Sequence, residues 1–304
     1  MGLTLAGNSI LAQGLQRIQR EIDDAFDGLL PVPEDNSARL VEAMRYAAIG
    51  GGKRVRPMLV ATVAEMYGAS RASAVYAGCA IEAIHVYSLI HDDLPCMDDD
   101  DMRHGKPTLH KKFDEATAVL AGDSLHDLAF EILGGRKVSE DPFVRAELVH
   151  ALASGSGHKG MAGGQMMDIV AETEGKDFDL HTITRLQQLK TGALLGAAVE
   201  MGAIIGKVPE EGRSHLRAYA RDIGLAFQIA DDLLDEEGDE ELAGKALRKD
   251  AEMGKATFVS LMGVEDARAQ AHALADQAIG HLGQHGSEAD LLRALATFIV
   301  ERDR

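Results

Sequence analysis

Apolar residues recur along most of the chain at helical spacing, and few segments alternate between apolar and polar positions as a strand would. The apolar stretches predict helices at about 37–48, 57–67, 72–91, 115–133, 143–154, 182–205, 214–234, 257–262, 267–282 and 288–302. Ser37 is a candidate cap for the first of these helices, and a run of three glycines at 50–52 follows its end. No segment predicts a convincing strand. The pattern therefore predicts an all-α protein.

Composition agrees with a helical fold of substantial size. Apolar residues make up 46% of the 304 residues, with 7 prolines and no tryptophan. No low-complexity linker divides the chain, so we expect residues 1–304 to form a single domain. The most apolar segment, 189–205, is interrupted by Lys190 and Glu200 and is short for a bilayer span. We therefore expect no membrane-spanning helix.

Charge and cysteine content exclude several classes of protein. The formal net charge of -18 argues against a nucleic-acid partner, which would need a basic face. Cys79 and Cys96 are too few for a disulfide framework. The first residues lack the basic and apolar regions of a secretory signal. A cytoplasmic location is the expectation.

The most informative polar feature is the run His-Asp-Asp-Leu-Pro-Cys-Met-Asp-Asp-Asp-Asp at 91–101, directly after an apolar helical segment. Carboxylates crowded at a helix C-terminus repel one another and face the negative end of the helix dipole, so they destabilise a protein unless cations neutralise them. Asp92 shares a helix face with His85, and Pro95 turns the chain so that Asp98 returns toward the same region. Asp92 and Asp98 are therefore candidate ligands of one metal group.

A second acidic group ends the predicted helix 214–234. Four residues at i, i+4, i+7 and i+11 form one stripe on this largely apolar helix: Gly224, Gln228, Asp231 and Asp235. A polar stripe is expensive to bury unless it lines a site, although a solvent-exposed face is the alternative. Mg²⁺ is usually held by a few carboxylates together with phosphate oxygens of a substrate. Two such clusters therefore predict a multi-metal site for a diphosphate.

Short basic motifs supply the opposite charge. They are Gly-Gly-Lys53-Arg-Val-Arg56-Pro, Arg103, Lys190-Thr191, Lys245 and Lys255. Glycine lets the backbone approach an anion closely, and arginine offers bidentate contacts to phosphate. Singly each motif is typical of surface charge. Together with the two acidic clusters they indicate a site for two diphosphates.

These motifs resemble those of the trans-prenyl diphosphate synthases, and most closely the bacterial members that form farnesyl diphosphate. The resemblance extends from about residue 40 to residue 304 and also includes Glu82-Ala-Ile-His85 and Phe227-Gln228-Ile-Ala-Asp231-Asp-Leu-Leu-Asp235. It implies an all-α fold, a single large helical bundle around a deep central cavity, assembled as a homodimer.

The resemblance also implies roles for individual residues. Isopentenyl diphosphate would be bound by Lys53, Arg56 and His85. The allylic diphosphate would be held by Arg103, Lys190, Lys245 and Lys255. Three Mg²⁺ ions, bound with the allylic diphosphate, would be held by Asp92, Asp98, Asp231 and Asp235, with Asp93 and Asp232 in support. Dipoles near the reacting carbons would come from Lys190, Thr191 and Gln228.

The implied reaction is the Mg²⁺-dependent head-to-tail condensation of isopentenyl diphosphate with dimethylallyl or geranyl diphosphate to give farnesyl diphosphate. Geranylgeranyl diphosphate is the alternative product, and Tyr87, five residues before Asp92, favours the shorter one because its ring could close the pocket floor. A terpene cyclase would need no isopentenyl site and usually carries an Asn/Ser/Glu pattern in its second motif. A non-catalytic synthase subunit is the remaining alternative, and two complete aspartate motifs argue against it.

Two positions depart from the family pattern. Family members commonly carry paired arginines after the first aspartate motif, whereas this chain has Arg103-His104, which leaves the affinity for isopentenyl diphosphate open. The Lys-x-Thr segment usually continues into Tyr-Pro, whereas this chain has Phe258-Val259. We expect the second change to alter the loop without changing the chemistry.

Overall fold

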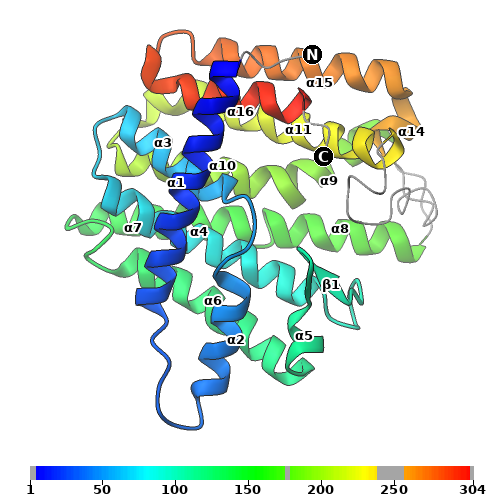
Figure 1. Cartoon of the computed structure of the whole chain (residues 1–304). Helices are drawn as coiled ribbons and strands as arrows, with labels where there is room; N and C mark the ends of the chain where they lie inside the picture. Colours follow the sequence, from blue (N-terminus) through cyan, green and yellow to red (C-terminus); the bar gives the residue numbers. More distant parts are fainter. Residues whose placement is uncertain (1–4, 175–178, 238–256, 302–304) are drawn as a thin grey trace. The chain divides into compact units, whose positions relative to one another are not determined.

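The computed structural model describes residues 5–174, 179–237 and 257–301, and most of this length is helical (Figure 1). The first helices are α1 (Leu5–Leu29), α2 (Ala38–Ala48), α3 (Val55–Met66), α4 (Arg71–Asp92), α5 (Leu109–Lys112), α6 (Glu115–Gly134), α7 (Pro142–Ser156) and α8 (Met161–Glu174). They are followed by α9 (Leu180–Gln187), η1 (Gln188–Gly192), α10 (Ala193–Ile205), η2 (Glu210–Arg213), α11 (Ser214–Glu237), α14 (Phe258–Met262), α15 (Val264–His281), η3 (Ser287–Ala289) and α16 (Asp290–Glu301). The prediction of an all-α fold is confirmed.

The chain divides into two compact units. The amino-terminal unit consists of Gln13–His150 with Met201–Lys207. The carboxy-terminal unit consists of the described parts of Met1–Ala12, Ala151–Glu200 and Val208–Arg304. Each unit has its own helices and its own acidic cluster, and a single domain over 1–304 stays a prediction.

Helix α4 is the core of the amino-terminal unit. It packs on α3 and α6, and α2 packs on both α4 and α6 (Figure 1). Among the described helices it is the one long and apolar enough to cross a membrane, but 67% of its apolar window is buried inside the structure. Burial of this kind is expected of a core helix, because a run of alanine, isoleucine and valine needs cover on every side. The C-terminal end of α4, where the first acidic cluster begins, is therefore held in place by the packing of the helix.

Helix α1 was not among the predicted helices. Its apolar stripe consists of Ile18, Ile22 and Phe26, all fully buried, at a spacing of four residues. Such spacing is typical of one buried helix face. Charged residues fill the positions between and obscure the stripe in the sequence. Pro31 follows the end of the helix, where no helical hydrogen bond requires the N–H that proline lacks.

In the carboxy-terminal unit, α11 packs on α15, α16, α14 and η1. The hydroxyl of the fully buried Tyr219 donates to the Leu292 carbonyl oxygen at 2.8 Å and so joins α11 to α16. The prediction of one continuous helix over 182–205 is wrong in part, because a π-helical turn, η1, separates α9 from α10. Helix α8 packs closely against the backbone of η1, because a Cβ added to Gly164 of α8 would lie 2.2 Å from the Lys190 backbone nitrogen.

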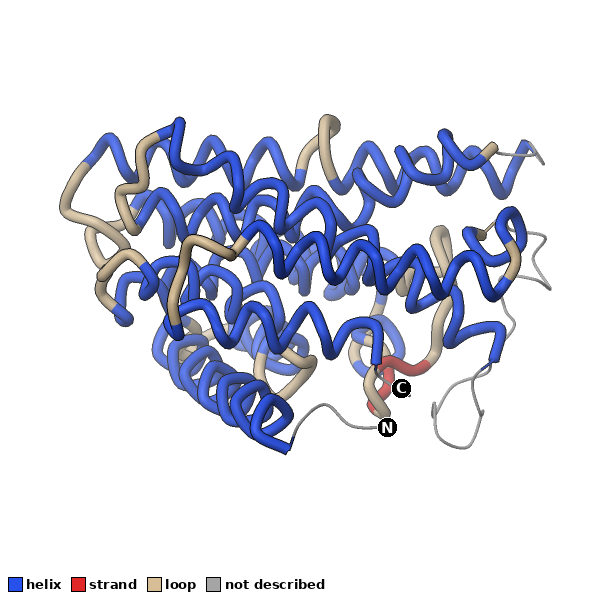
Figure 2. The backbone as a smooth tube through the Cα atoms, turned by 90° about the horizontal axis from the view of Figure 1, so that it is seen from above, coloured by secondary structure: helices blue, strands red, loops and turns tan. Residues whose placement is uncertain are grey.

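Other expectations need correction. Strands β1 (Met102–Arg103) and β2 (Lys106–Pro107) form a small antiparallel hairpin, seen in Figure 2 as the short red segments. His104 and Gly105 have φ values of 50° and 74°, as two-residue hairpin turns require. The hydroxyl of Ser37 donates to Asp35 and accepts no hydrogen bond from the N–H groups of α2, so the Ser37 side chain does not cap that helix. Helices α5 and α8 were also unpredicted, and the glycines of α8 explain why.

Candidate active site

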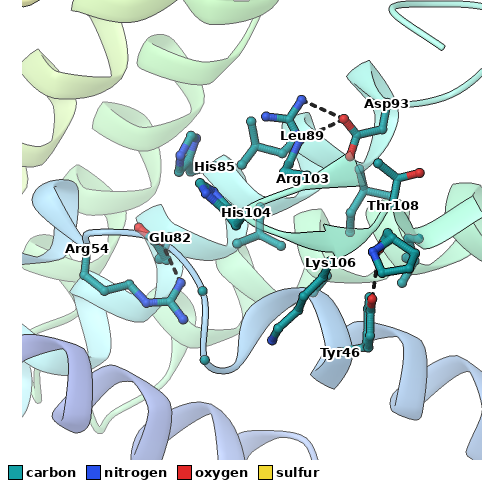
Figure 3. A pocket seen from close by; sticks show the side chains of 18 residues that line it. Tyr46, Arg54, Glu82, His85, Leu89, Asp93, Arg103, His104, Lys106 and Thr108 are labelled. Carbon is teal, nitrogen blue, oxygen red and sulfur yellow. Dashed lines mark hydrogen bonds and ion pairs between the residues drawn. The ribbon is translucent and has the colours of Figure 1, made fainter. Parts of the chain in front are cut away.

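A basic pocket lies in the amino-terminal unit, with a volume of about 670 Å³ that includes open solvent at its mouth (Figure 3). Its walls are the end of α2, the three glycines of a glycine loop (residues 50–53), one face of α4 and the β1–β2 hairpin. The acidic, basic and histidine side chains in its lining are Arg54, Glu82, His85, Asp93, Arg103, His104 and Lys106. Besides the buried Arg54, Arg103 and Lys106 bring positive charge to the pocket, and His104 adds more when it is protonated, so the pocket suits an anion.

The glycine loop brings backbone to the pocket edge. Gly50 and Gly52 have φ values of 74° and 69°, which an L side chain rarely adopts. Arg54, directly after the loop, is also left-handed, with φ 54°. It is buried, and it donates to Glu82 of α4 at 2.8 Å. Its positive charge is therefore already matched by a carboxylate.

Of the three residues predicted to bind isopentenyl diphosphate, one lines the pocket and two do not. His85 lines the pocket, whereas Lys53 is exposed at the loop and neither Lys53 nor Arg56 belongs to the lining. Burial lowers the pKa of Arg56, and Glu82 opposes that shift. The buried Nε of Arg56 has no hydrogen-bond partner in the described part of the chain. The roles of these three residues stay predictions.

His85 is held in its neutral form. Burial is the largest cause of its pKa lying well below the ordinary value, and the charges of Arg56 and Arg103 add to the effect. Figure 3 shows His85 beside His104, with Arg103 close by. A neutral imidazole can donate one hydrogen bond to a phosphate oxygen but adds no charge. The cationic side chains around it must therefore supply the electrostatic attraction.

The β1–β2 hairpin carries Arg103 and His104 into the pocket. Arg103 donates from Nε and Nη2 to the same oxygen of Asp93, at 2.8 Å and 2.6 Å. Burial raises the pKa of Asp93, and Arg103 opposes that shift. The pKa of His104 is lowered by burial, then by Arg103 and Arg54. Arg103 therefore shares a pocket with His85 and His104, and its predicted role toward the allylic diphosphate stays a prediction.

The first aspartate loop (residues 93–101) follows α4, which ends at Asp92, three residues before Pro95. The backbone N–H of Asp98 donates to the Asp92 carbonyl oxygen at 2.8 Å, so the loop returns to the helix end. Asp92 is half-buried and Asp98 is exposed. Cys96 is exposed within this loop, whereas Cys79 is buried in α4. The expected turn is present, and metal binding by Asp92 and Asp98 remains a prediction.

The second cluster is carried by α11. Gly224 is buried against Gly192 of η1, and Gln228 donates to the Gln187 oxygen at 2.8 Å. Asp231 and Asp235 are half-buried. The polar stripe therefore begins against η1 and not on a solvent-exposed face. Because this cluster belongs to the carboxy-terminal unit and the first to the other unit, their convergence on one site remains a prediction.

Asp232 has a structural partner. It is buried, and its Oδ2 accepts a hydrogen bond from the Phe258 N–H at 2.7 Å. That N–H belongs to the first turn of α14, where backbone donors lack helical partners and the helix dipole favours an anion. Asp232 thus joins the end of α11 to the start of α14.

The π-helical turn presents Lys190, which forms a short ion pair with Asp168 of α8. Thr191 is half-buried in the same turn. Asp168 was not singled out from the sequence, although a lone acid after Gly-Gly-Gln-Met-Met was a usable signal. Lys106 was also missed, and its place two residues after His104 could have indicated it. Lys245 and Lys255 lie outside the described residues.

Within the described ranges, no three His, Cys, Asp or Glu side chains form a group that could hold a metal ion unaided. The predicted metal-binding residues supply only carboxylate oxygens: Asp92, Asp98, Asp231 and Asp235. Oxygen donors of this kind are those that Mg²⁺ takes, and it commonly completes its shell with water and substrate phosphate. The donor set therefore fits Mg²⁺.

Comparison with known proteins identifies the family of the chain. The family model for polyprenyl synthetase matches residues 37–297. The chain is 42% identical over 300 residues to farnesyl diphosphate synthase of Escherichia coli (strain K12), covering 96% of this chain and 99% of that protein. It is also 42% identical over 290 residues to geranylgeranyl pyrophosphate synthase 4 of Arabidopsis thaliana, covering 95% and 76%. A crystal structure of an FPP/GFPP synthase from Zymomonas mobilis matches with a TM-score of 0.88 and 57% identity, covering 95% and 98%.

The fold and the two aspartate motifs define an all-α synthase of the isoprenoid type, as the resemblance implied. The chain belongs to the polyprenyl synthetase family.

Proposed function

We propose that the protein is a prenyltransferase that condenses isopentenyl diphosphate with dimethylallyl diphosphate and then with geranyl diphosphate, and so forms farnesyl diphosphate. The observation that carries this proposal is the basic pocket beside an aspartate-ended core helix, in a chain 42% identical to a farnesyl diphosphate synthase. A terpene cyclase would have no use for an anion pocket apart from the diphosphate site at its metals.

Isopentenyl diphosphate would enter the basic pocket. Its diphosphate would meet the glycine-loop backbone, with Lys53 and Arg56 from one side and His85 from α4. His104 and Lys106 of the hairpin line the same pocket and would add further donors. Charge-assisted hydrogen bonds of this kind are the strong ones, so the pocket can bind a substrate whose other end is a plain hydrocarbon.

The allylic diphosphate would be held by Lys190 and Arg103, together with Lys245 and Lys255. Asp92, Asp98, Asp231 and Asp235 would hold Mg²⁺, three ions in all, which would neutralise the charge on the departing diphosphate. Lys190 is already oriented by Asp168, and the amide of Gln228 by Gln187. These fixed groups need little reorganisation as charge develops, which is how electrostatic stabilisation lowers a barrier.

In the reaction the allylic C–O bond breaks and the double bond of isopentenyl diphosphate attacks the resulting carbon cation. A proton then leaves the new C–C product and re-forms a double bond. The released diphosphate can accept that proton, so no protein base is required. His85 would be a weak base, because burial lowers its pKa.

A homodimer in the cytoplasm is part of the proposal. Val119 and Leu120 of α6 are large apolar residues with exposed fractions of 40% and 55%. A second copy of the chain could cover these side chains. Sedimentation of the purified protein will measure the oligomeric state directly.

Incubation with Mg²⁺, isopentenyl diphosphate and each allylic primer tests the function, with product length read by chromatography. We expect C15 as the main product. A C20 product would mean geranylgeranyl synthesis, and C25 would match the name of the Zymomonas mobilis relative. Consumption of the primer without isopentenyl incorporation would indicate a cyclase, and no reaction with any primer would indicate a non-catalytic subunit.

A further inference from the structure

A buried ion network supports the basic pocket, and its outermost member, Asp23, lies on α1. The guanidinium of Arg54 donates from Nη1 to Glu82 Oε1 at 2.8 Å. Its Nη2 donates to Asp23 Oδ1 at 2.8 Å and to the Ala48 carbonyl oxygen at 2.6 Å. Figure 3 shows the Arg54–Glu82 pair at one end of the pocket.

Asp23 has a second contact, and it is with the glycine loop itself. The backbone N–H of Gly50 donates to the same Oδ1 atom of Asp23 at 3.2 Å. One carboxylate oxygen therefore ties the first residue of the loop to the guanidinium that follows the loop. Loss of this oxygen would leave a loop donor and a buried guanidinium each short of one acceptor.

The loop needs such support because of its backbone. Gly50, Gly52 and Arg54 have φ values of 74°, 69° and 54°, so three of five consecutive residues are left-handed. A non-glycine residue such as Arg54 keeps this conformation only where its surroundings hold it. Arg54 is 2% exposed, and its two carboxylate partners supply that hold.

We infer that Asp23 is a positioning residue for isopentenyl diphosphate: through Gly50 and Arg54 it keeps the glycine loop in the shape that presents its backbone and Lys53 to the diphosphate. This inference rests on the proposed function. Asp23 lies outside residues 37–297, which the family model matches. Its side chain is not in the pocket lining, and it acts only through the loop and Arg54.

A purely structural role is the competing explanation, and the two differ in what they change. If Asp23 only joined α1 to its unit, its loss would lower the melting temperature and affect both substrates alike. If Asp23 positions the glycine loop, its loss would weaken the binding of isopentenyl diphosphate alone. Glu82 still holds Arg54 in the Asp23 variants, so the protein should remain folded.

The experiment compares Asp23→Ala, Asp23→Asn and the control Asp24→Ala, which changes an exposed neighbour on α1. Steady-state kinetics will give kcat and the KM of isopentenyl and geranyl diphosphates, and calorimetry in EDTA will give the affinity for isopentenyl diphosphate without metal or turnover. Asp23→Ala should raise the KM for isopentenyl diphosphate about tenfold, because a charge-assisted contact and its geometry are lost. Asp23→Asn keeps the Oδ1 acceptor and should recover most of the affinity, and Asp24→Ala should match the wild type.

The outcomes separate this inference from the proposed function. A wild-type protein that forms no product would defeat the proposed function, while calorimetry would still show whether Asp23 supports isopentenyl binding. An active protein whose Asp23→Ala variant keeps the wild-type KM and affinity for isopentenyl diphosphate would overturn the inference alone. An equal rise in both KM values, with a lower melting temperature and no recovery in Asp23→Asn, would also overturn it.

Discussion

His104 brings a pH-dependent charge into a pocket where a permanent one is usual in the family. Burial, Arg103 and Arg54 lower its pKa, while Asp93 and Glu82 oppose them. The imidazole is therefore neutral at neutral pH without an anion, and a bound diphosphate raises its pKa by favouring the imidazolium. Binding then takes up a proton. Its contribution to affinity is complete below the pKa of the free state and is lost as pH rises through the pKa of the bound state.

His104→Arg should lower the KM for isopentenyl diphosphate and flatten its dependence on pH. A charge-assisted hydrogen bond contributes about 1.5 to 3 kcal/mol, so a change of roughly tenfold or more is expected at high pH. His158→Arg, at an exposed position between α7 and α8, adds the same charge elsewhere and serves as the control. Identical KM profiles for the wild type and His104→Arg would mean that His104 does not contact the substrate.

Tyr87 is held between two helices. Its ring makes edge-on contacts with His91 of α4 and His126 of α6, at centroid distances of 5.7 Å and 5.2 Å. Burial raises the pKa of Tyr87, and Asp92 adds to the shift. At about 1.5 Å per residue the ring lies roughly 7 to 8 Å along α4 from Asp92, at a depth that a growing prenyl chain would reach.

Tyr87→Ala should therefore move the main product from C15 to C20 or longer, with little effect on the first condensation, because Tyr87 is not in the lining of the basic pocket. Tyr76→Ala removes a ring from the same helix, near Lys137, and should leave product length unchanged. Chromatography of the dephosphorylated products measures the distribution. A folded and active Tyr87→Ala variant that still stops at C15 would place the pocket floor elsewhere.

At the scale of elements, the π-helical turn η1 depends on a glycine in another helix. A Cβ added to Gly164 would lie 2.2 Å from the Lys190 nitrogen, so alanine there must push η1 away from α8. Overpacking of this kind typically costs about 1 to 3 kcal/mol. The same displacement would move Lys190 away from Asp168 and lower kcat.

Urea unfolding and steady-state kinetics of Gly164→Ala will measure both effects. Gly196→Ala in α10 is the matched control, because a Cβ there would meet nothing within 4 Å. That variant should be neutral or more stable by about 0.5 to 1 kcal/mol, since alanine favours the helix. Wild-type kcat and stability in Gly164→Ala would show that η1 accommodates the extra methyl group.

Elements with an uninterrupted apolar stripe were predictable, and those shaped by distant contacts were not. Helices α4 and α11 were visible because apolar periodicity and their acidic ends are local properties of the sequence. The stripe of α1 was hidden by charge, and η1 exists where Gly164 of another helix allows close approach. The aspartates of the candidate site were likewise proposed from local spacing. The Arg54–Asp23 and Lys190–Asp168 pairs were missed, because only the fold brings their members together.

At the scale of the whole molecule, each unit carries one aspartate cluster, and the proposed reaction needs both. Asp92→Ala and Asp231→Ala should therefore each lower kcat by orders of magnitude, since several kcal/mol of charge stabilisation are at stake and about 1.4 kcal/mol is tenfold. Asp127→Ala, at an exposed position of α6, is the control. Circular dichroism will confirm that each variant is folded. Near-normal turnover of either variant at saturating Mg²⁺ would show that the cluster it belongs to is not required for catalysis.

The two cysteines differ sharply in their surroundings. Cys79 is fully buried, and burial, followed by Glu82, raises the pKa of its thiol, so little nucleophilic thiolate forms. Cys96 is exposed in the first aspartate loop, between Asp92 and Asp98. A maleimide dye should therefore attach to the native chain at one place only. The wild-type protein thus carries its own attachment point for a fluorescent reporter, and changes in emission would follow the arrival of metal and substrate in real time.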